Sequence, residues 1–174
     1  PLLPILRSLG IEDFNDVIKP KEYTLNAEQE NAVNTFKCDF EICSRNTYLL
    51  HGITGSGKTL VFINMIKYVI SKGYKAIVLI PEISLTYQTV LRMAEHFGDR
   101  VAIINSKLSK NEKFYQFERI KNDDADVIIG PRSAIFAPVK NLGLIVIDEE
   151  HDSAYKNENI PTFNVRDVAE KLSE

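Results

Sequence analysis

The chain has 174 residues, which is enough for one domain with its own hydrophobic core. Hydrophobic residues make up 44% of it and charged residues 26%, proportions that are typical of globular proteins. No apolar run approaches the ~20 residues of a membrane-spanning helix, and the N-terminus has no signal-peptide pattern, so we expect a cytoplasmic protein without a membrane partner. The net charge of -3 argues against a broad basic surface for nucleic acid but allows a few local contacts with a strand.

The cysteines and the first residues carry little functional signal. Cys38 and Cys43 are too few for a four-ligand zinc site, so we expect two reduced thiols. Residues 1–22 are predicted to be a linker with a short helical lead-in, because Gly10 would end a helix over residues 2–9 and Pro20 marks a linker. Residues 23–174 then form the folded domain.

From residue 26 onwards, apolar strands alternate with helices. Capping boxes that begin at Asn26 and Ser109 mark two helix N-termini. Phe114 and Phe117 have helical spacing and are predicted to face the core. The alternation predicts an α/β fold, a parallel sheet flanked by helices that binds ligands at the carboxyl ends of its strands. We expect helices over residues 26–36, 58–71, 84–97 and 109–121, and strands over residues 47–51, 76–80, 101–104, 126–129 and 144–147.

Residues 52–59 read G-I-T-G-S-G-K-T and match the phosphate-binding loop pattern G-x-x-x-x-G-K-[ST] without a mismatch. The glycines let backbone N–H groups curl around phosphate oxygens at the positive end of the following helix. Lys58 would contact the β- and γ-phosphates of ATP, and Thr59 would bind Mg²⁺. A chance glycine-rich turn is the alternative, and the expected strand before and helix after argue against it. The predicted nucleotide-binding residues of this loop are Gly52, Thr54, Gly55, Ser56, Gly57, Lys58 and Thr59.

A second motif, D-E-E-H, follows the predicted strand 144–147. A strand that ends in carboxylates places them at the sheet edge where the phosphates would lie. Asp148 is predicted to hold Mg²⁺, and Glu149 to orient and deprotonate the attacking water. An acidic tetrapeptide alone is more often a solvated turn. The P-loop upstream in the same predicted sheet favours the catalytic interpretation.

Five segments together resemble the PriA family of bacterial replication-restart helicases, within helicase superfamily 2. They span residues 50–59, 80–86, 130–138, 148–156 and 165–169, and include I-P-E-I-S-L-T, G-P-R-S-A-I-F-A-P and D-E-E-H-D-S-A-Y-K. The resemblance implies a RecA-like P-loop lobe, the first motor lobe of a 3′-to-5′ DNA helicase that acts in replication restart and primosome assembly at stalled forks. The alternative is another superfamily 2 DNA translocase, such as a fork-reversal helicase or a restriction translocase. A non-motor P-loop enzyme or a structural module that has lost nucleotide binding would fit these motifs less well.

The resemblance also implies roles for single residues. Gln29 would read the adenine, although it is equally suited to cap its helix. His151 would join the catalytic group by linking the carboxylates to the loop after them, or it is structural. Arg132 suits a phosphate contact because a guanidinium binds phosphate through two N–H groups, and an ordinary surface arginine is the alternative. The implied DNA-contacting residues are Thr86, Arg132, Ser133, Lys156, Phe163 and Arg166.

Residues 155–166 resemble the aromatic-rich loop that links DNA occupancy to ATP hydrolysis in the family. Aromatic side chains there would stack on bases. Thr162 and Asn164 stand where the family pattern has a basic residue and a histidine, so this chain's loop is poorer in DNA-binding groups. A plain surface loop is the alternative.

Several parts of the family pattern do not occur in this sequence. They are the second motor lobe with its arginine finger, the Ser-Ala-Thr motif, the amino-terminal DNA-binding domain and the cysteine-rich zinc insertion. We therefore expect residues 23–174 to be a first lobe truncated before its Ser-Ala-Thr motif, which uses ATP and Mg²⁺ but is nearly inactive alone. In the full-length protein the resemblance implies zinc, single-stranded and forked DNA, and primosome and single-strand-binding proteins as partners.

Overall fold

The computed structural model describes residues 24–44, 46–158 and 160–173. The lead-in helix and linker predicted within residues 1–22 lie outside these described residues. The helices are α2 (Ala27–Glu41), α3 (Lys58–Ser71), α4 (Tyr87–Phe97), α5 (Lys110–Lys121) and α6 (Val165–Ser173), with 3-10 turns η1 (Gly98–Arg100), η2 (Arg132–Phe136) and η3 (Ser153–Tyr155). The strands are β1 (Lys75–Leu79), β2 (Val101–Ile103), β3 (Val127–Gly130), β4 (Leu142–Ile147), β5 (Lys156–Asn157) and β6 (Phe163–Asn164).

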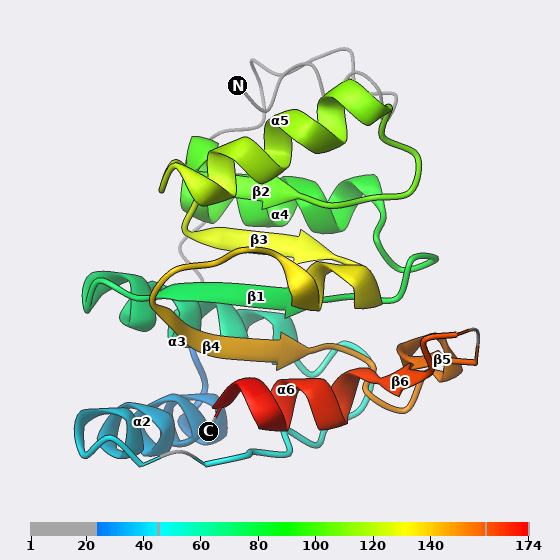
Figure 1. Cartoon of the computed structure of the whole chain (residues 1–174). Coiled ribbons are helices and arrows are strands. Elements are labelled where there is room, and N and C mark those ends of the chain that lie inside the picture. The colour runs from blue at the N-terminus through cyan, green and yellow to red at the C-terminus, as the bar shows by residue number, and fades with distance from the viewer. Residues whose placement is uncertain (1–23, 45, 159, 174) are drawn as a thin grey trace.

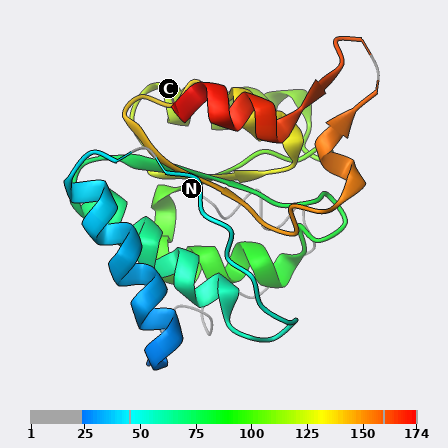
Figure 2. The same ribbon diagram turned by 90° about the horizontal axis from the view of Figure 1, so that it is seen from below.

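A parallel four-stranded sheet in the order β2-β3-β1-β4 forms the centre of the fold (Figure 1). Every residue of β1, β2 and β3 is buried, and successive side chains of each strand enter two separate apolar clusters. Helices α3 and α4 cover one face, and α5, η2 and α6 cover the other (Figure 2). The predicted α/β architecture with a flanked parallel sheet is therefore confirmed.

Local sequence signals explain where several helices begin and end. Both predicted capping boxes form, at Asn26 before α2 and at Ser109 before α5. Gly57 begins α3 and Gly73 follows its end, each with a φ of +82°, a left-handed conformation that glycine adopts without strain. Helix α2 continues past the predicted Phe36 to Glu41. No helix among the described residues is both long and apolar enough to cross a membrane.

The strand predicted over residues 47–51 is wrong, since this segment forms no strand. Side chains at the start of this segment contact helix α2 instead. Tyr48 and Asn46 both donate hydrogen bonds to the carboxylate of Asp39, and the Tyr48 ring packs edge-on against Phe36. Leu49 is 76% exposed, so this apolar segment lacks the burial that a sheet strand would have.

Helix α4 starts later than predicted. The prediction placed its start at Ser84, but α4 begins at Tyr87 with Thr86 as the N-cap residue. Residues 81–85 form a tight turn instead, in which the N–H groups of Ser84 and Leu85 both donate to the Pro81 carbonyl. This turn leaves the Ser84 side chain free of the helix.

The prediction that Phe114 and Phe117 face the core is also wrong, because they are 67% and 37% exposed. Helix α5 turns its polar side toward β2, which is an edge strand with unpaired backbone groups. The Gln116 side chain accepts from the Ile103 N–H, and Arg119 donates to the Val101 carbonyl. Satisfying these buried groups decides which side of α5 faces inward.

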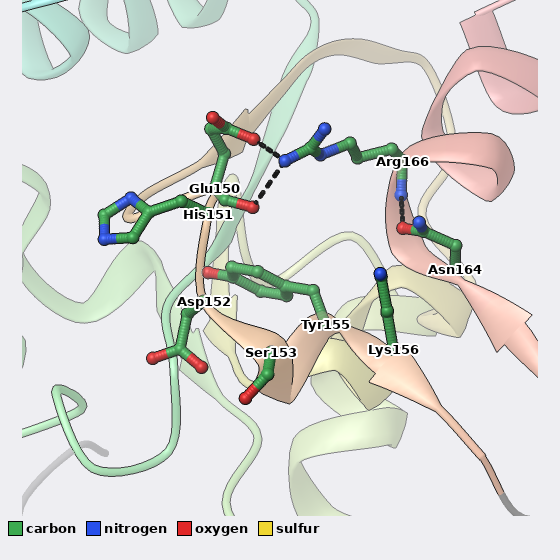
Figure 3. Close-up of a pocket in the computed structure, with 8 residues that line it drawn as sticks. All are labelled: Glu150, His151, Asp152, Ser153, Tyr155, Lys156, Asn164 and Arg166. Carbon is green, nitrogen blue, oxygen red and sulfur yellow. Dashed lines mark hydrogen bonds and ion pairs between the residues drawn. The ribbon is translucent and has the colours of Figure 1, made fainter.

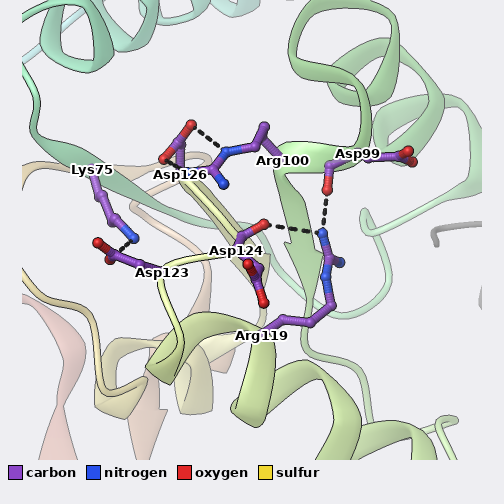
Figure 4. Close-up of polar contacts among 7 residues, drawn as sticks. All are labelled: Lys75, Asp99, Arg100, Arg119, Asp123, Asp124 and Asp126. Carbon is purple, nitrogen blue, oxygen red and sulfur yellow. Dashed lines mark hydrogen bonds and ion pairs between the residues drawn. The ribbon is translucent and has the colours of Figure 1, made fainter.

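Ion pairs and hydrogen bonds connect the turns at the amino ends of the strands (Figure 4). Arg119 also donates to the carbonyls of Asp99 and Asp124. Arg100 pairs with Asp126 through two nitrogens, at 2.8 and 2.6 Å. The buried ammonium of Lys75 pairs with Asp123. These contacts tie the helix-to-strand turns together at the amino ends of β1, β2 and β3.

Candidate functional site

The predicted catalytic residues lie at the opposite end of the sheet, at the carboxyl ends of its strands. Asp148 directly follows β4, and its N–H donates to the carbonyl of Leu79 at the end of β1, with 2.9 Å between nitrogen and oxygen. The P-loop residues 52–57 lead into α3, which packs under these two strands. The positive charge of Lys58 acts on the Asp148 carboxyl group. Two motifs 90 residues apart in the sequence thus meet at one edge.

The P-loop has the conformation that its glycines permit. Gly55 and Gly57 both have a φ of +82°, and Gly57 begins α3. The Lys58 ammonium folds back over the loop and donates to the carbonyls of Gly52 and Ile53, at 2.7 and 3.0 Å. The first N–H groups of α3 therefore lie beside a concentrated positive charge, which is an arrangement suited to phosphate.

Gln29 joins α2 to the P-loop. Its Oε1 accepts from the Asn26 N–H, which completes the capping box, and its Nε2 donates to the Ser56 carbonyl at 2.9 Å. Gly57 has a φ of +82°, which favours glycine, and a Cβ atom there would come within 2.5 Å of this Nε2, so that the Gln29 side chain would have to shift. The capping alternative for Gln29 is confirmed, and adenine recognition by the same residue stays a prediction.

The two carboxylates differ in their surroundings. Asp148 is half-buried, and burial raises the pKa of its carboxyl group, with the Glu149 charge adding to the rise. The N–H of Glu149 and the charge of Lys58 oppose this shift. Glu149 is exposed, has a φ of +49°, and accepts a hydrogen bond from Ser84 at 3.0 Å. The half-buried Asp148 carboxylate is therefore suited to bind a cation, and the exposed Glu149 carboxylate is accessible to water.

The residues present fit a magnesium nucleotide. Mg²⁺ in nucleotide sites is held by one or two protein oxygens, with phosphates and water completing six ligands. Asp148 and Thr59 would supply such oxygens, and Lys58 would supply the charge that faces phosphate. The described residues hold no cluster of three or more histidine, cysteine or acidic side chains for a metal, so they offer no all-protein metal cage.

A polar pocket of about 300 Å³ lies beside the carboxylates, under the β5–β6 hairpin (Figure 3). Arg166 pairs with the Glu150 carboxylate and donates to the Glu150 carbonyl at 2.9 Å. The exposed His151 side chain points away from this ion pair. The pocket is lined by Glu150, His151, Asp152, Ser153, Tyr155, Lys156, Asn164 and Arg166.

Arg132 is held by the chain that follows the carboxylates. Its Nη1 donates to the carbonyls of Ala154 and Lys156, at 3.2 and 2.7 Å. The half-buried guanidinium keeps further N–H groups beyond these two contacts. Phe163 packs edge-on against Phe136, with 5.2 Å between ring centroids. The structure thereby joins the two segments that the sequence predicted to contact DNA.

The other residues predicted to contact DNA lie on separate segments of the chain. Ser133 and Lys156 are exposed near Arg132, whereas Thr86 lies after β1 at the start of α4. The Thr86 hydroxyl is 3.3 Å from that of Thr89. DNA binding by these side chains stays a prediction.

Sequence reasoning gave Ser84 and Tyr155 no part beside the carboxylates. The buried Tyr155 hydroxyl is 2.9 Å from the Leu79 carbonyl and 2.6 Å from the Asp148 carbonyl. Burial raises the pKa of Tyr155, so the hydroxyl stays protonated and remains a donor. The Tyr-Lys pair after the carboxylates was a recognisable signal, but only the fold brings this hydroxyl to β1.

Comparison with known proteins adds to this geometry. The replication restart protein PriA of Bacillus subtilis (strain 168) is 44% identical over 156 residues, which cover 90% of this chain and 19% of that protein. PriA of Chlamydia trachomatis is 46% identical over 151 residues, or 86% of this chain and 20% of that protein, and PriA of Treponema pallidum is 40% identical over 147 residues, or 84% and 22%. The chain thus spans about a fifth of the length of these relatives.

A family model described as type III restriction enzyme, res subunit, matches residues 22–174. The match covers the P-loop, the carboxylates and the loop beyond them, and the parallel sheet has the RecA-like P-loop architecture of that domain. The chain therefore belongs to the family of the type III restriction enzyme res subunit.

Proposed function

We propose that this chain is the ATP-binding motor lobe of a 3′-to-5′ DNA helicase that acts in replication restart and primosome assembly at stalled forks. The observation that carries the proposal is that the P-loop leads into α3 under the sheet and Asp148 follows β4 beside the end of β1, in a chain whose relatives are replication restart proteins. A replication role would place the full-length protein in the cytoplasm.

The proposed chemistry assigns one task to each group. Lys58 and the N–H groups at the start of α3 bind the phosphates, and Gln29 reads the adenine. Asp148 and Thr59 hold Mg²⁺, which neutralises phosphate charge when bound. Glu149 orients the attacking water and takes its proton, for which its exposed carboxylate is available. His151 links this carboxylate pair to the loop that follows.

The proposed DNA path runs along the loops beside the carboxylates. Arg132, Ser133 and Lys156 supply polar and cationic groups for the strand's backbone, Thr86 contributes from the loop after β1, and Phe163 offers a ring for base stacking. Arg166 holds the Glu150 end of the same loop. Because Arg132 already binds the loop carbonyls, contact with a phosphate would be transmitted to the segment next to the carboxylates.

We propose that residues 23–174 alone bind nucleotide but turn it over slowly. The relatives are about five times as long. The resemblance implies that an arginine finger would lie on a second motor lobe. Such a finger is commonly worth ~10³–10⁵ in rate. Zinc, forked DNA, and primosome and single-strand-binding partners are proposed only for the full-length protein.

A restriction translocase is the second candidate, because the matched family is described by a restriction enzyme subunit. Both candidates would hydrolyse ATP when DNA is present, and they differ in the DNA structure that stimulates them. A replication-restart helicase should respond most strongly to forks. A restriction translocase should respond to linear duplex that carries its recognition site.

The test is a steady-state ATPase assay on the full-length protein without DNA, with linear single strands and duplexes, and with forks. We expect stimulation by forks at lower DNA concentration than by linear duplex. Glu149→Gln should bind ATP but reduce turnover by at least ~10²-fold, since an amide is not a base. DNA-independent ATPase in the wild type, or unreduced turnover in Glu149→Gln, would refute the proposed function.

A further inference from the structure

A hydrogen bond connects the loop after β1 to the exposed carboxylate of the catalytic pair. Ser84 Oγ donates to Glu149 Oε2 at 3.0 Å, although the two residues are 65 positions apart in the sequence. Among the roles predicted from the sequence, Ser84 has no part in catalysis or in nucleotide binding. Its contact is therefore a feature of the tertiary structure that the proposed function has not used.

The Ser84 backbone is held in place by its own loop. The Ser84 N–H donates to the Pro81 carbonyl at 2.8 Å, and the Ser84 carbonyl accepts from the Thr89 hydroxyl at 3.2 Å. Leu85, the next residue, is 7% exposed and belongs to the apolar cluster under the sheet. Because the Ser84 backbone is held at both its N–H and its carbonyl, and the next residue is buried, the Ser84 hydroxyl restricts the orientation of the Glu149 carboxylate that accepts from it.

The Glu149 backbone is restrained as well. Its φ of +49° is unusual for a residue with a side chain, and it is held by two hydrogen bonds. The Glu149 N–H donates to Asp148 Oδ1 at 3.0 Å, and the Glu149 carbonyl accepts from the Asp152 N–H at 2.8 Å. With the backbone set in this way, the remaining freedom of Glu149 lies in its side chain, which is where Ser84 binds.

We infer that Ser84 is a positioning residue that acts through Glu149 and holds its carboxylate in the orientation from which it accepts a proton from water. This inference rests on the proposed function, because it gives Ser84 a part in the reaction assigned to Glu149. One carboxylate oxygen accepts from Ser84, and the other keeps its lone pairs for water.

The same contact couples an exposed loop to the reaction. Ile83, which precedes Ser84, is 94% exposed, and Glu82 is exposed on the same turn. Through Ser84, this exposed turn after β1 is joined to the proposed base.

The experiment compares Ser84→Ala, Ser84→Thr and Ser106→Ala in the full-length protein. Ser106→Ala is the matched control, because Ser106 donates to Glu82 on the same turn but does not contact Glu149. The assays are ATPase kcat and KM with saturating single-stranded DNA, affinity for a fluorescent ADP analogue, and thermal melting. Each variant is also made with Glu149→Gln.

Ser84→Ala should lower kcat roughly three- to tenfold with unchanged KM and ADP affinity, because it removes one hydrogen bond that orients the base. Ser84→Thr should restore most of the rate, and Ser106→Ala should match the wild type. In the Glu149→Gln background, Ser84→Ala should cause no further loss.

Three results would overturn the inference. They are an unchanged kcat in Ser84→Ala, an equal loss in Ser106→Ala, or an additive loss in the Glu149→Gln background. A Ser84→Ala protein that melts well below wild type would be judged by Ser84→Thr, whose failure to restore kcat while restoring stability would also overturn it. Failure of the proposed function is distinct, since it would appear as a wild-type protein without DNA-dependent ATPase.

Discussion

The hydroxyl of Tyr155 lies 2.6 Å from the main-chain carbonyl oxygen of Asp148 and 2.9 Å from that of Leu79. One buried side chain therefore holds the carboxyl ends of β1 and β4 together, directly behind the predicted Mg²⁺ ligand. The ring comes from the turn η3, after the carboxylates, so the chain folds back to support its own catalytic strand.

Tyr155→Phe keeps the ring and removes this hydroxyl. We expect a loss of about 1–2 kcal/mol in the free energy of unfolding, because buried carbonyls lose a donor. The measurement is urea unfolding of the 174-residue chain, with Tyr115→Phe as the matched control because Tyr115 is 44% exposed. Equal stability of the two variants would contradict the role assigned to the Tyr155 hydroxyl.

Asp148→Asn should stabilise the chain at neutral pH when no metal or nucleotide is added. Burial raises the pKa of Asp148, so ionising it costs more in the folded state than in the unfolded state, where it titrates near ~3.9. The wild type therefore loses stability as pH rises through the folded pKa, and asparagine avoids that loss. We expect a melting temperature a few degrees (~2–5 °C) higher at pH 7.

Thermal melts in a chelating buffer between pH 4 and pH 7 check this expectation for Asp148→Asn. The advantage of the variant should shrink as pH falls toward the unfolded pKa of about 3.9. The exposed Asp99→Asn is the control for replacing a carboxylate by an amide. A variant less stable than wild type at pH 7 would show that burial of Asp148 is compensated in the folded chain.

Lys58→Ala should weaken ADP binding by at least ~10-fold, because it removes the cation that faces the phosphates. Isothermal titration calorimetry on the 174-residue chain measures the affinity, for which we expect a wild-type Kd in the ~μM–mM range. Lys67→Ala is the control, since Lys67 is an exposed lysine of the same helix. Similar affinities for the two variants would refute the P-loop assignment.

Arg132→Ala should reduce DNA stimulation of the full-length ATPase more than it reduces the basal rate. The substitution removes the two donors that hold the carbonyls of Ala154 and Lys156, as well as a proposed phosphate contact. We expect DNA stimulation to fall by roughly 5- to 50-fold, which corresponds to the loss of one charged contact. The exposed Arg92→Ala serves as the control, and an equal loss of basal and stimulated rates would indicate a role confined to the nucleotide site.

Arg119→Met should destabilise the chain by about 1–3 kcal/mol, because the carbonyl of Val101 loses its buried donor. Arg92→Met makes the same substitution on the exposed face of α4 and should change stability by less than ~0.5 kcal/mol. Urea unfolding of both variants compares them directly. If Arg119→Met were neutral, the polar side of α5 would not determine how the helix packs on β2.

Local sequence determined the P-loop and several of the helix ends. Glycine adopts the left-handed conformation at residue 57 without strain. The capping boxes at Asn26 and Ser109 join residues that are three positions apart. Such features involve neighbours along the chain, so their spacing is visible in the sequence. The three buried strands were predictable for a similar reason, since their continuous apolar runs have few alternatives to a parallel sheet.

Only the tertiary structure decided which side of α5 faces inward and whether residues 47–51 pair. The apolar spacing of Phe114 and Phe117 favoured burial, but the edge strand β2 needed donors and acceptors that Gln116 and Arg119 supply. Residues 47–51 have strand character, yet strand formation requires a partner, and Asp39 of α2 binds this segment instead. Neither the partner nor the edge can be identified from local spacing.

The candidate site divides in the same way. The residue types for phosphate, Mg²⁺ and water were present in two contiguous motifs, because each motif needs a fixed order of side chains around a single turn. The contacts of Ser84 with Glu149 and of Tyr155 with Leu79 join parts of the chain that meet only when the sheet is assembled. A hydrogen bond depends on distance in space, and residues 65 or 76 positions apart acquire that distance only through the fold.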